Sequence, residues 1–352
     1  MQPGHRKSGR SRAFTLVELL VSIAVLALLM VLLVSITDAT RASWSDATAK
    51  TQQFREAREA FEAITRRLSQ ATLNTYWDYS YPNNDQTRPP TAYVRQSELR
   101  FISGPGNELG LGANRTTHGI FFQAPLGYVS GSTYRRFRNL LNTWGYFVEY
   151  GSDQSARPAF INASILPYRN RFRLMELMEP SESMTLYQKQ AMNGGAAAYN
   201  GREWFAEPLA SSANVGVVAE NIIALVILPK LSAADQASGN YTEGSLAPNY
   251  LYDSTGLDMS TSGDASLNPR NQLPPVVQVT MVAVDELSAS RLGDAGAASL
   301  MTWLGSHFSD PMELQTDLKN LEKYLVDNRI KYRIFTSNVS IRAAKWSRTQ
   351  EN

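Results

Sequence analysis

The chain has 352 residues, a formal net charge of +2 and no cysteine. The absence of cysteine excludes disulfide bonds, thiol catalysis and Cys-based metal sites. Charged residues make up only 19% of the sequence and aromatic residues 10%, a composition typical of an ordered, β-rich domain with a polar surface rather than of a disordered chain.

The first thirteen residues form a basic leader that contains no acidic residue. Beyond it, acidic residues outnumber basic ones, so the rest of the chain lacks the basic excess that indicates nucleic-acid binding. Because positively charged flanks stay on the cytoplasmic side of a membrane, we expect the leader there and the C-terminal bulk on the outer side. The basic residues of the leader are Arg6, Lys7, Arg10 and Arg12.

An apolar run follows the leader. Residues 19–37 contain no charged residue, no glycine and no proline, and the run lies between Glu18 and Asp38. About 20 helical residues, at about 1.5 Å each, match a hydrocarbon layer of about 30 Å. The run is therefore predicted to be a helix long enough to span a bilayer.

Glu18, at the start of this run, requires a cationic partner. An unpaired carboxylate at mid-membrane costs about 2.5–3.5 kcal/mol. Arg12 lies on a different helical face, whereas an amine at Phe14 would lie four residues before Glu18 on the same face. Such an amine exists only if the chain is cut between Ala13 and Phe14.

Residues 13–18 read Ala-Phe-Thr-Leu-Val-Glu, and this segment between a basic leader and an apolar run resembles the type IV prepilin processing site. The resemblance implies that a prepilin peptidase cuts after Ala13 and that Phe14 becomes N-methylated. It also implies that Glu18 neutralises the amine of a neighbouring subunit during assembly. The family usually has Gly before the cut; Ala13 is the smallest alternative, so we expect processing to be retained.

Two other interpretations of the N-terminus remain open. A cleaved secretory signal also has a basic start, but its apolar core is usually about 7–15 residues and ends at a small-x-small site. A plain single-pass anchor explains the length of the run but not Glu18. The prepilin interpretation accounts for both features.

The helical pattern continues beyond the apolar run, since residues 14–81 contain neither Gly nor Pro. One helix is therefore predicted from Phe14 to about Leu73, without a kink in its apolar half. Its second half is amphipathic, with Glu62 and Arg66 placed as an i,i+4 pair. We expect its apolar stripe to pack on the chain's own domain, the alternative being a dimeric coiled coil; the stripe consists of Phe54, Ala57, Phe61, Ile64 and Leu68.

Residues 74–92 are predicted to form an aromatic-rich loop. Its aromatic residues are expected to fix the helix to a sheet, with a sugar-binding platform as the alternative. These residues are Tyr76, Trp77, Tyr79 and Tyr81.

Strands alternate with turn-forming clusters through the rest of the chain. Residues 221–228 are almost wholly apolar and are predicted to be a strand buried on both faces. A short helix is predicted at 201–209 and a polar segment at 232–274. A second helix is predicted at 311–327, with Asp310 as its N-cap. Its apolar face consists of Leu314, Leu318, Leu321 and Leu325. The other predicted strands are 92–102, 119–124, 145–150, 172–178, 276–284 and 332–346.

Three later segments, 218–225, 273–281 and 332–342, resemble the J-type minor pseudopilins of type II secretion and the large W-type minor pilins. The helix at 311–327 departs from the usual J-type pattern. Together with the Ala-Ala-Lys-Trp-Ser-Arg ending, it makes the chain still more similar to the Verru_Chthon cassette protein C type. These resemblances imply a large minor subunit.

No catalytic motif is found, so no enzymatic activity is expected. The histidines His5, His118 and His307 are scattered, and a structural role is expected for His118. The glycines around 104–112 indicate a turn cluster rather than a phosphate loop.

The loop 253–264 contains Asp253, Asp258 and Asp264; it is predicted to be solvated, with a weaker calcium-binding alternative. The basic run 135–138 is expected to be solvated, with a partner contact as the alternative.

The sequence as a whole predicts an α+β, type IV pilin-like protein: a long N-terminal helix packed on an antiparallel β-sheet domain. The expected segments are a leader (1–13), a transmembrane and assembly half-helix (14–37), an amphipathic half-helix (38–73) and a periplasmic domain (74–352). The expected role is that of a minor pilin or pseudopilin subunit of a cell-envelope filament, with no cofactor. The expected partners are prepilin peptidase, other pilin subunits, an inner-membrane assembly platform and membrane lipid. The alternative is a periplasmic binding or enzymatic domain on an uncleaved single-pass anchor.

Overall fold

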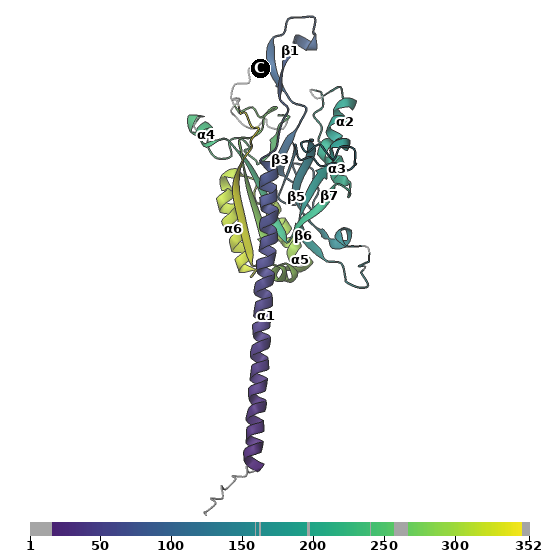
Figure 1. Ribbon diagram of the computed structural model, residues 1–352. Coiled ribbons are helices and arrows are strands. Elements are labelled where there is room, and N and C mark those ends of the chain that lie inside the picture. Colours follow the sequence, from purple (N-terminus) through teal and green to yellow (C-terminus); the bar gives the residue numbers. More distant parts are fainter. Residues whose placement is uncertain are drawn as a thin grey trace, which may run out of the picture. The chain divides into compact units, whose positions relative to one another are not determined.

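The computed structural model describes residues 16–158, 160–161, 163–195, 198–239, 241–256 and 267–346. The chain separates into two compact units, Met1–Gln52 and Gln53–Asn352, each described by itself below. Helix α1 (Leu16–Leu68) runs through residues of both (Figure 1). It ends about five residues before the predicted end, because Gln70 and Ala71 form tighter i−3 bonds and the Thr72 N–H donates to Gln123 O of the sheet at 2.9 Å.

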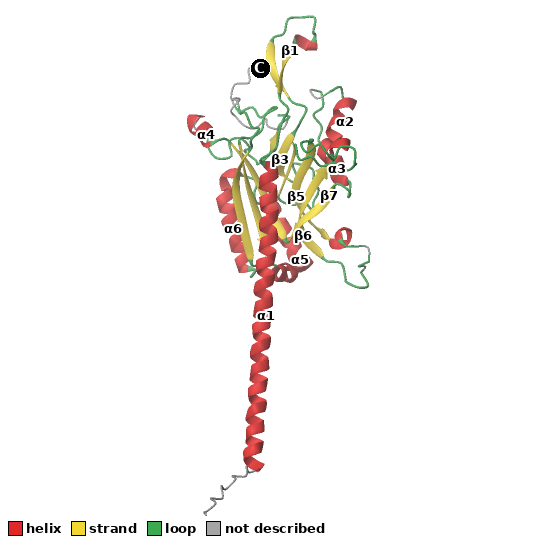
Figure 2. Cartoon of the chain, viewed as in Figure 1, coloured by secondary structure: helices red, strands yellow, loops and turns green. Residues whose placement is uncertain are grey.

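The larger unit is built on a six-stranded antiparallel sheet in the order β7-β6-β5-β4-β3-β9 (Figure 2). The strands predicted at 119–124, 145–150 and 172–178 are confirmed as the cores of β4, β5 and β6. The strand bounds are β3 Phe101–Pro105, β4 His118–Ala124, β5 Asn142–Ser152, β6 Asn170–Glu179, β7 Val215–Glu220 and β9 Tyr252–Asp253.

A second, three-stranded antiparallel sheet has the order β11-β10-β8. Its strands are β8 (Ile222–Lys230), β10 (Val276–Val284) and β11 (Tyr332–Ser340). Every residue of β8 except Lys230 is buried, which confirms the strand predicted to be covered on both faces. Such a strand is apolar throughout because side chains on both faces of the sheet meet other elements. The predicted α+β class, a long N-terminal apolar helix followed by an antiparallel β-sheet domain, is confirmed and is consistent with a pilin-like fold.

The apolar stripe of α1 packs on the chain's own domain, as predicted. Ile64 and Leu68 are fully buried, and the rings of Phe61 and Phe335 of β11 lie 5.8 Å apart. The exposed side of this segment carries i,i+4 ion pairs, but Glu62 pairs with Arg58 at 3.1 Å rather than with the predicted Arg66.

The predicted helix at 311–327 is also confirmed, as a 3₁₀ turn that leads into α6. The Asp310 carboxylate accepts from the Met312 N–H at 2.9 Å, which is the expected cap. Three of the four predicted apolar leucines are buried, while Leu318 is partly buried.

Among its described residues, the larger unit contains five helices besides α1: α2 Thr185–Met192, α3 Glu203–Ala210, α4 Ala233–Gly239, α5 Glu286–Gly305 and α6 Leu314–Asp327. It also contains the 3₁₀ turns η1 Pro82–Asn84, η2 Asp153–Ala156, η3 Ser181–Ser183 and η4 Pro311–Glu313.

The prediction for residues 74–102 was wrong in two respects. The predicted loop contains a strand, β1 (Tyr76–Ser80), which pairs with β2 (Ala92–Gln96) in a separate two-stranded sheet. The single predicted strand 92–102 is divided into β2 and β3, which belong to different sheets. The aromatic residues of β1 do not fix α1 to the sheet, because Tyr76, Trp77 and Tyr79 are 43–55% exposed.

Three further segments differ from the predictions. The predicted polar segment, residues 232–274, contributes to the core, where Leu246, Tyr250 and Tyr252 are buried. Helix α5 was missed because its sequence is rich in Ala, Ser and Gly, and Gly293 interrupts the helical backbone with φ 56°. The predicted final strand extends only to Ser340.

Candidate functional site

The first part of α1 presents an apolar surface. Within the segment Leu16–Arg41, a stretch of 18 residues has a mean hydropathy of 3.1, and by length and composition the segment can cross a membrane. Large apolar side chains between Leu16 and Ile36 are 50–78% exposed within this unit. An apolar surface of this extent requires lipid or other apolar helices to cover it.

Three of the four hydroxyl groups in Leu16–Arg41 bond within the helix. Ser22 Oγ donates to Glu18 O at 2.7 Å, Thr37 Oγ1 to Leu33 O at 2.7 Å, and Thr40 Oγ1 to Ile36 O at 2.8 Å. Each bond spans four residues, which satisfies the hydroxyl without a partner outside the helix. These three hydroxyl groups therefore do not prevent the segment from entering an apolar environment.

Glu18 lies in the first turn of α1 and is exposed. A carboxylate at this end of a helix is favoured by the partial positive charge of the N-terminal N–H groups. The two other predicted site residues, Ala13 and Phe14, lie outside the described residues. The cleavage position and the relation of Phe14 to Glu18 therefore stay predictions.

In the larger unit, a charged cluster joins α1 to the six-stranded sheet. Arg67 forms an ion pair with Glu176 of β6 and donates to the Tyr146 hydroxyl of β5 at 2.8 Å. Its guanidinium lies 4.7 Å from the ring centre of Trp144, and Trp144 Nε1 donates to Tyr146 Oη at 3.0 Å. Desolvation raises the pKa of Glu176, although the charge of Arg67 opposes this rise. The cluster joins the C-terminal end of α1 to β5 and β6 through polar contacts, in addition to the apolar packing of the stripe.

His118 is buried and has the predicted structural environment. Its Nδ1 accepts from the Ile227 N–H at 3.0 Å, and its Nε2 lies 3.0 Å from Phe308 O. A neutral imidazole with its proton on Nε2 satisfies both contacts. Burial lowers the pKa of His118 to about 4, so the side chain links β4 to β8 and the α5–α6 connection as an uncharged group.

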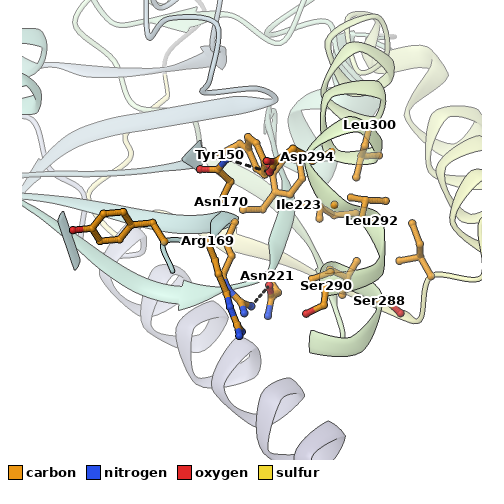
Figure 3. Close-up of a pocket in the computed structure, with 18 residues that line it drawn as sticks. Tyr150, Arg169, Asn170, Asn221, Ile223, Ser288, Ser290, Leu292, Asp294 and Leu300 are labelled. Carbon is orange, nitrogen blue, oxygen red and sulfur yellow. Dashed lines mark hydrogen bonds between the residues drawn. The ribbon is translucent and has the colours of Figure 1, made fainter. Parts of the chain in front are cut away.

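A cavity of about 430 Å³ lies between the β5–β6 pair and helix α5 (Figure 3). Asp294 accepts hydrogen bonds from Tyr150 Oη at 2.7 Å and from Asn170 Nδ2 at 3.1 Å. These bonds lower the pKa of Asp294, so the carboxylate is ionised at neutral pH and is poorly suited to be a general acid. The described lining residues include no histidine, lysine or cysteine, and thus supply no conventional nucleophile–base pair.

Only part of the candidate calcium loop, residues 253–264, lies within the described residues. Asp253 belongs to β9 and is buried, which corrects the prediction of a solvated position. Its Oδ1 accepts from the backbone N–H and the hydroxyl of Thr255, each at 2.8 Å. Asp258 and Asp264 lie outside the described residues, and among the residues that are described no cluster of three or more His, Asp or Glu could hold a metal ion. The basic run 135–138 is exposed, as predicted.

Sequence reasoning missed the inward orientation of Arg67 and the whole of the cavity beside α5. Arg67 lies outside the apolar stripe of α1, but its neighbour Leu68 belongs to the stripe, so a long side chain at 67 can reach the sheet. The signal for α5 was the spacing of Ala297, Leu300 and Leu304, which are its buried apolar residues.

Comparison with known proteins gives one positive result. The Prokaryotic N-terminal methylation motif matches residues 8–34, a span that contains Ala13, Phe14 and Glu18. No curated protein and no solved structure gives a significant match to the chain. Proteins with this motif are structural subunits, and the motif implies processing by prepilin peptidase and assembly with other pilin subunits. The match supports a type IV pilin-like protein, a substrate of prepilin peptidase whose apolar helix suggests a single-pass membrane anchor.

Proposed function

We propose that this chain is a minor pilin or pseudopilin subunit of a type IV pilus-like or type II secretion pseudopilus filament. The observation that carries the proposal is the methylation motif at residues 8–34, which leads into an exposed apolar helix. Before processing, the leader (1–13) lies in the cytoplasm, residues 14–37 span the inner membrane, and the segment 38–73 with the domain 74–352 lies on the periplasmic side.

Assembly begins with the cut between Ala13 and Phe14. The new amine of Phe14 is N-methylated and keeps its positive charge. Glu18 of one subunit then pairs with the Phe14 amine of the adjacent subunit. An isolated carboxylate costs about 2.5–3.5 kcal/mol at mid-membrane, and the pair offsets this cost as the helix leaves the lipid for the filament.

Apolar packing holds the assembled helices together. Because lipid tails are as apolar as the side chains of residues 16–36, the gain comes from close packing between helices rather than from escape from water. The absence of Gly and Pro keeps this part of α1 regular. The inner-membrane assembly platform and membrane lipid are further partners in this proposal.

The mature N-terminus tests the proposal. When the chain is produced together with a prepilin peptidase, mass spectrometry of the purified protein should find a chain that begins at N-methylated Phe14. An Ala13→Gly variant, with the residue usual for the family, should be cut at the same bond. A chain that still begins at Met1 in the presence of active peptidase would favour the alternative of a domain on a permanent anchor.

A further inference from the structure

One face of the β1–β2 hairpin carries three aromatic residues and one arginine. The antiparallel register places Trp77 opposite Arg95 and Tyr79 opposite Tyr93. Because side chains alternate along a strand, these four residues share one face. The Tyr79 and Tyr93 rings lie 4.7 Å apart, and the Arg95 guanidinium lies 5.3 Å from the centre of the Trp77 ring. We call these four residues the aromatic face.

The aromatic face is exposed. Trp77 is 55% exposed, Tyr79 46% and Tyr93 57%. Three large aromatic side chains together on the surface are more typical of a binding site than of a surface without function. The Tyr79 and Tyr93 hydroxyls lie 3.2 Å apart, so both flat ring surfaces and hydroxyl groups are available to a ligand.

A small cleft of about 190 Å³ borders this face, and Trp77, Arg95, Asn271 and Lys345 are among its lining residues. The floor is fixed by Asn271, which is buried in the left-handed region at φ 54° and whose Nδ2 donates to Arg95 O at 2.6 Å. Within the described part of the chain, neither Arg95 nor Lys345 forms an ion pair with a carboxylate. The cleft therefore has two cationic side chains and a preorganised floor, an arrangement that complements an anion.

We propose that the aromatic face and its cleft bind a carboxylate-bearing polysaccharide. The carboxylate of one sugar unit interacts with Arg95 and Lys345, and neighbouring sugar rings place their C–H faces on Trp77 and on the Tyr79–Tyr93 pair. The cleft is smaller than the sites of drug-sized ligands, about 300–1,000 Å³, and suits a single acidic group on a longer chain. This activity goes beyond assembly and does not depend on Glu18.

The chemistry of the face favours a saccharide over other polymers. A stable protein interface buries about 800 Å² on each partner, whereas this face consists of four side chains beside a small cleft. Single-stranded nucleic acid needs a positively charged groove that follows several phosphates, whereas this cleft presents two cationic side chains. Ring faces, hydroxyl groups and one local cationic site instead match the alternating C–H faces, hydroxyl groups and carboxylates of an acidic polysaccharide.

The test measures binding of the full-length protein, in detergent, to polygalacturonate, to neutral dextran and to single-stranded DNA. Polygalacturonate should bind, and both Trp77→Ala and Arg95→Gln should weaken binding by about tenfold or more. Lys345→Gln should weaken it less, because Lys345 is exposed whereas Arg95 is half-buried. Phe137→Ala is the matched control, since Phe137 is 59% exposed on another loop, and it should bind like the wild type.

Three outcomes would overturn the proposal. Equal binding of dextran would remove the role of the carboxylate, and preferential binding of DNA would assign the face to nucleic acid. Unchanged polygalacturonate binding in the folded Arg95→Gln variant would show that the cleft is not the site. Circular dichroism verifies that each variant is folded, and Arg95→Gln keeps the backbone contact with Asn271 in case Trp77→Ala destabilises the hairpin.

Discussion

The substitution Glu18→Ala is expected to leave membrane insertion intact and to lower filament incorporation at least about tenfold. Insertion does not need the carboxylate, since removing a charge makes residues 16–41 more apolar. Incorporation needs it, because Glu18 is proposed to pair with the Phe14 amine of the neighbouring subunit. The variant leaves that amine without its partner, and a loss of about 1.4 kcal/mol corresponds to a factor of about ten in the equilibrium. The measurement compares the amount of protein in the membrane fraction with the amount in sheared filaments.

Asp38→Ala is the matched control for this experiment. Asp38 is the acidic residue at the other end of the apolar run, and α1 includes both positions. Removing it deletes the same charge without affecting the proposed pair, so the variant should enter filaments like the wild type. Wild-type incorporation of Glu18→Ala, or an equal defect in Asp38→Ala, would remove the charge-pairing argument.

Arg67→Met is expected to lower the free energy of unfolding of the larger unit by about 3 kcal/mol. The substitution leaves the largely buried Glu176 carboxylate without its cation and removes the hydrogen bond to Tyr146. About 3 kcal/mol is the lower end of the range for breaking a buried pair, because 29% of the Arg67 side chain remains exposed. Denaturant unfolding of the detergent-solubilised protein, followed by tryptophan fluorescence, measures the change, since Trp144 lies in the cluster.

Arg66→Met provides the control for Arg67→Met. Arg66 is the preceding residue of α1 and is exposed, so its replacement should change stability by less than about 0.5 kcal/mol. Adding Glu176→Gln to Arg67→Met should recover part of the loss, because no uncompensated charge then remains buried. Equal effects of the two arginine substitutions would contradict the role assigned to the cluster.

The elements that were predicted well from the sequence are those in which a strong local pattern, of helix-forming or apolar residues, determines the structure. Helix α1 has no helix breaker, β8 is apolar at nearly every position, and α6 has both a capping carboxylate and a leucine face. In each, local pattern and burial indicate the same structure. The Ala-, Ser- and Gly-rich α5 has a weak local preference, and its packing against the rest of the unit decides its conformation.

The parts that sequence predicted poorly depend on where distant segments meet. The aromatic residues of β1 have the composition of a buried contact, but whether another element covers them is a property of the assembled fold. Arg67 has a charge typical of a solvated position, and its burial depends on Glu176, more than 100 residues away in the sequence. The proposed assembly residues do not depend on the fold in this way. The prepilin-like motif at 13–18 is a continuous stretch of sequence, so it can be recognised without the fold.

The central claim is that Glu18 of one subunit contacts the N-terminal amine of the next, and a lipid-soluble carbodiimide tests it directly. This reagent joins a carboxylate to an amine in contact, and the ion pair of Lys189 with Glu207 within the chain serves as its internal control. In assembled filaments, mass spectrometry should find Glu18 covalently linked to the N-terminal residue of a neighbouring pilin subunit. Formation of the Lys189–Glu207 link without any link to Glu18 would contradict the account.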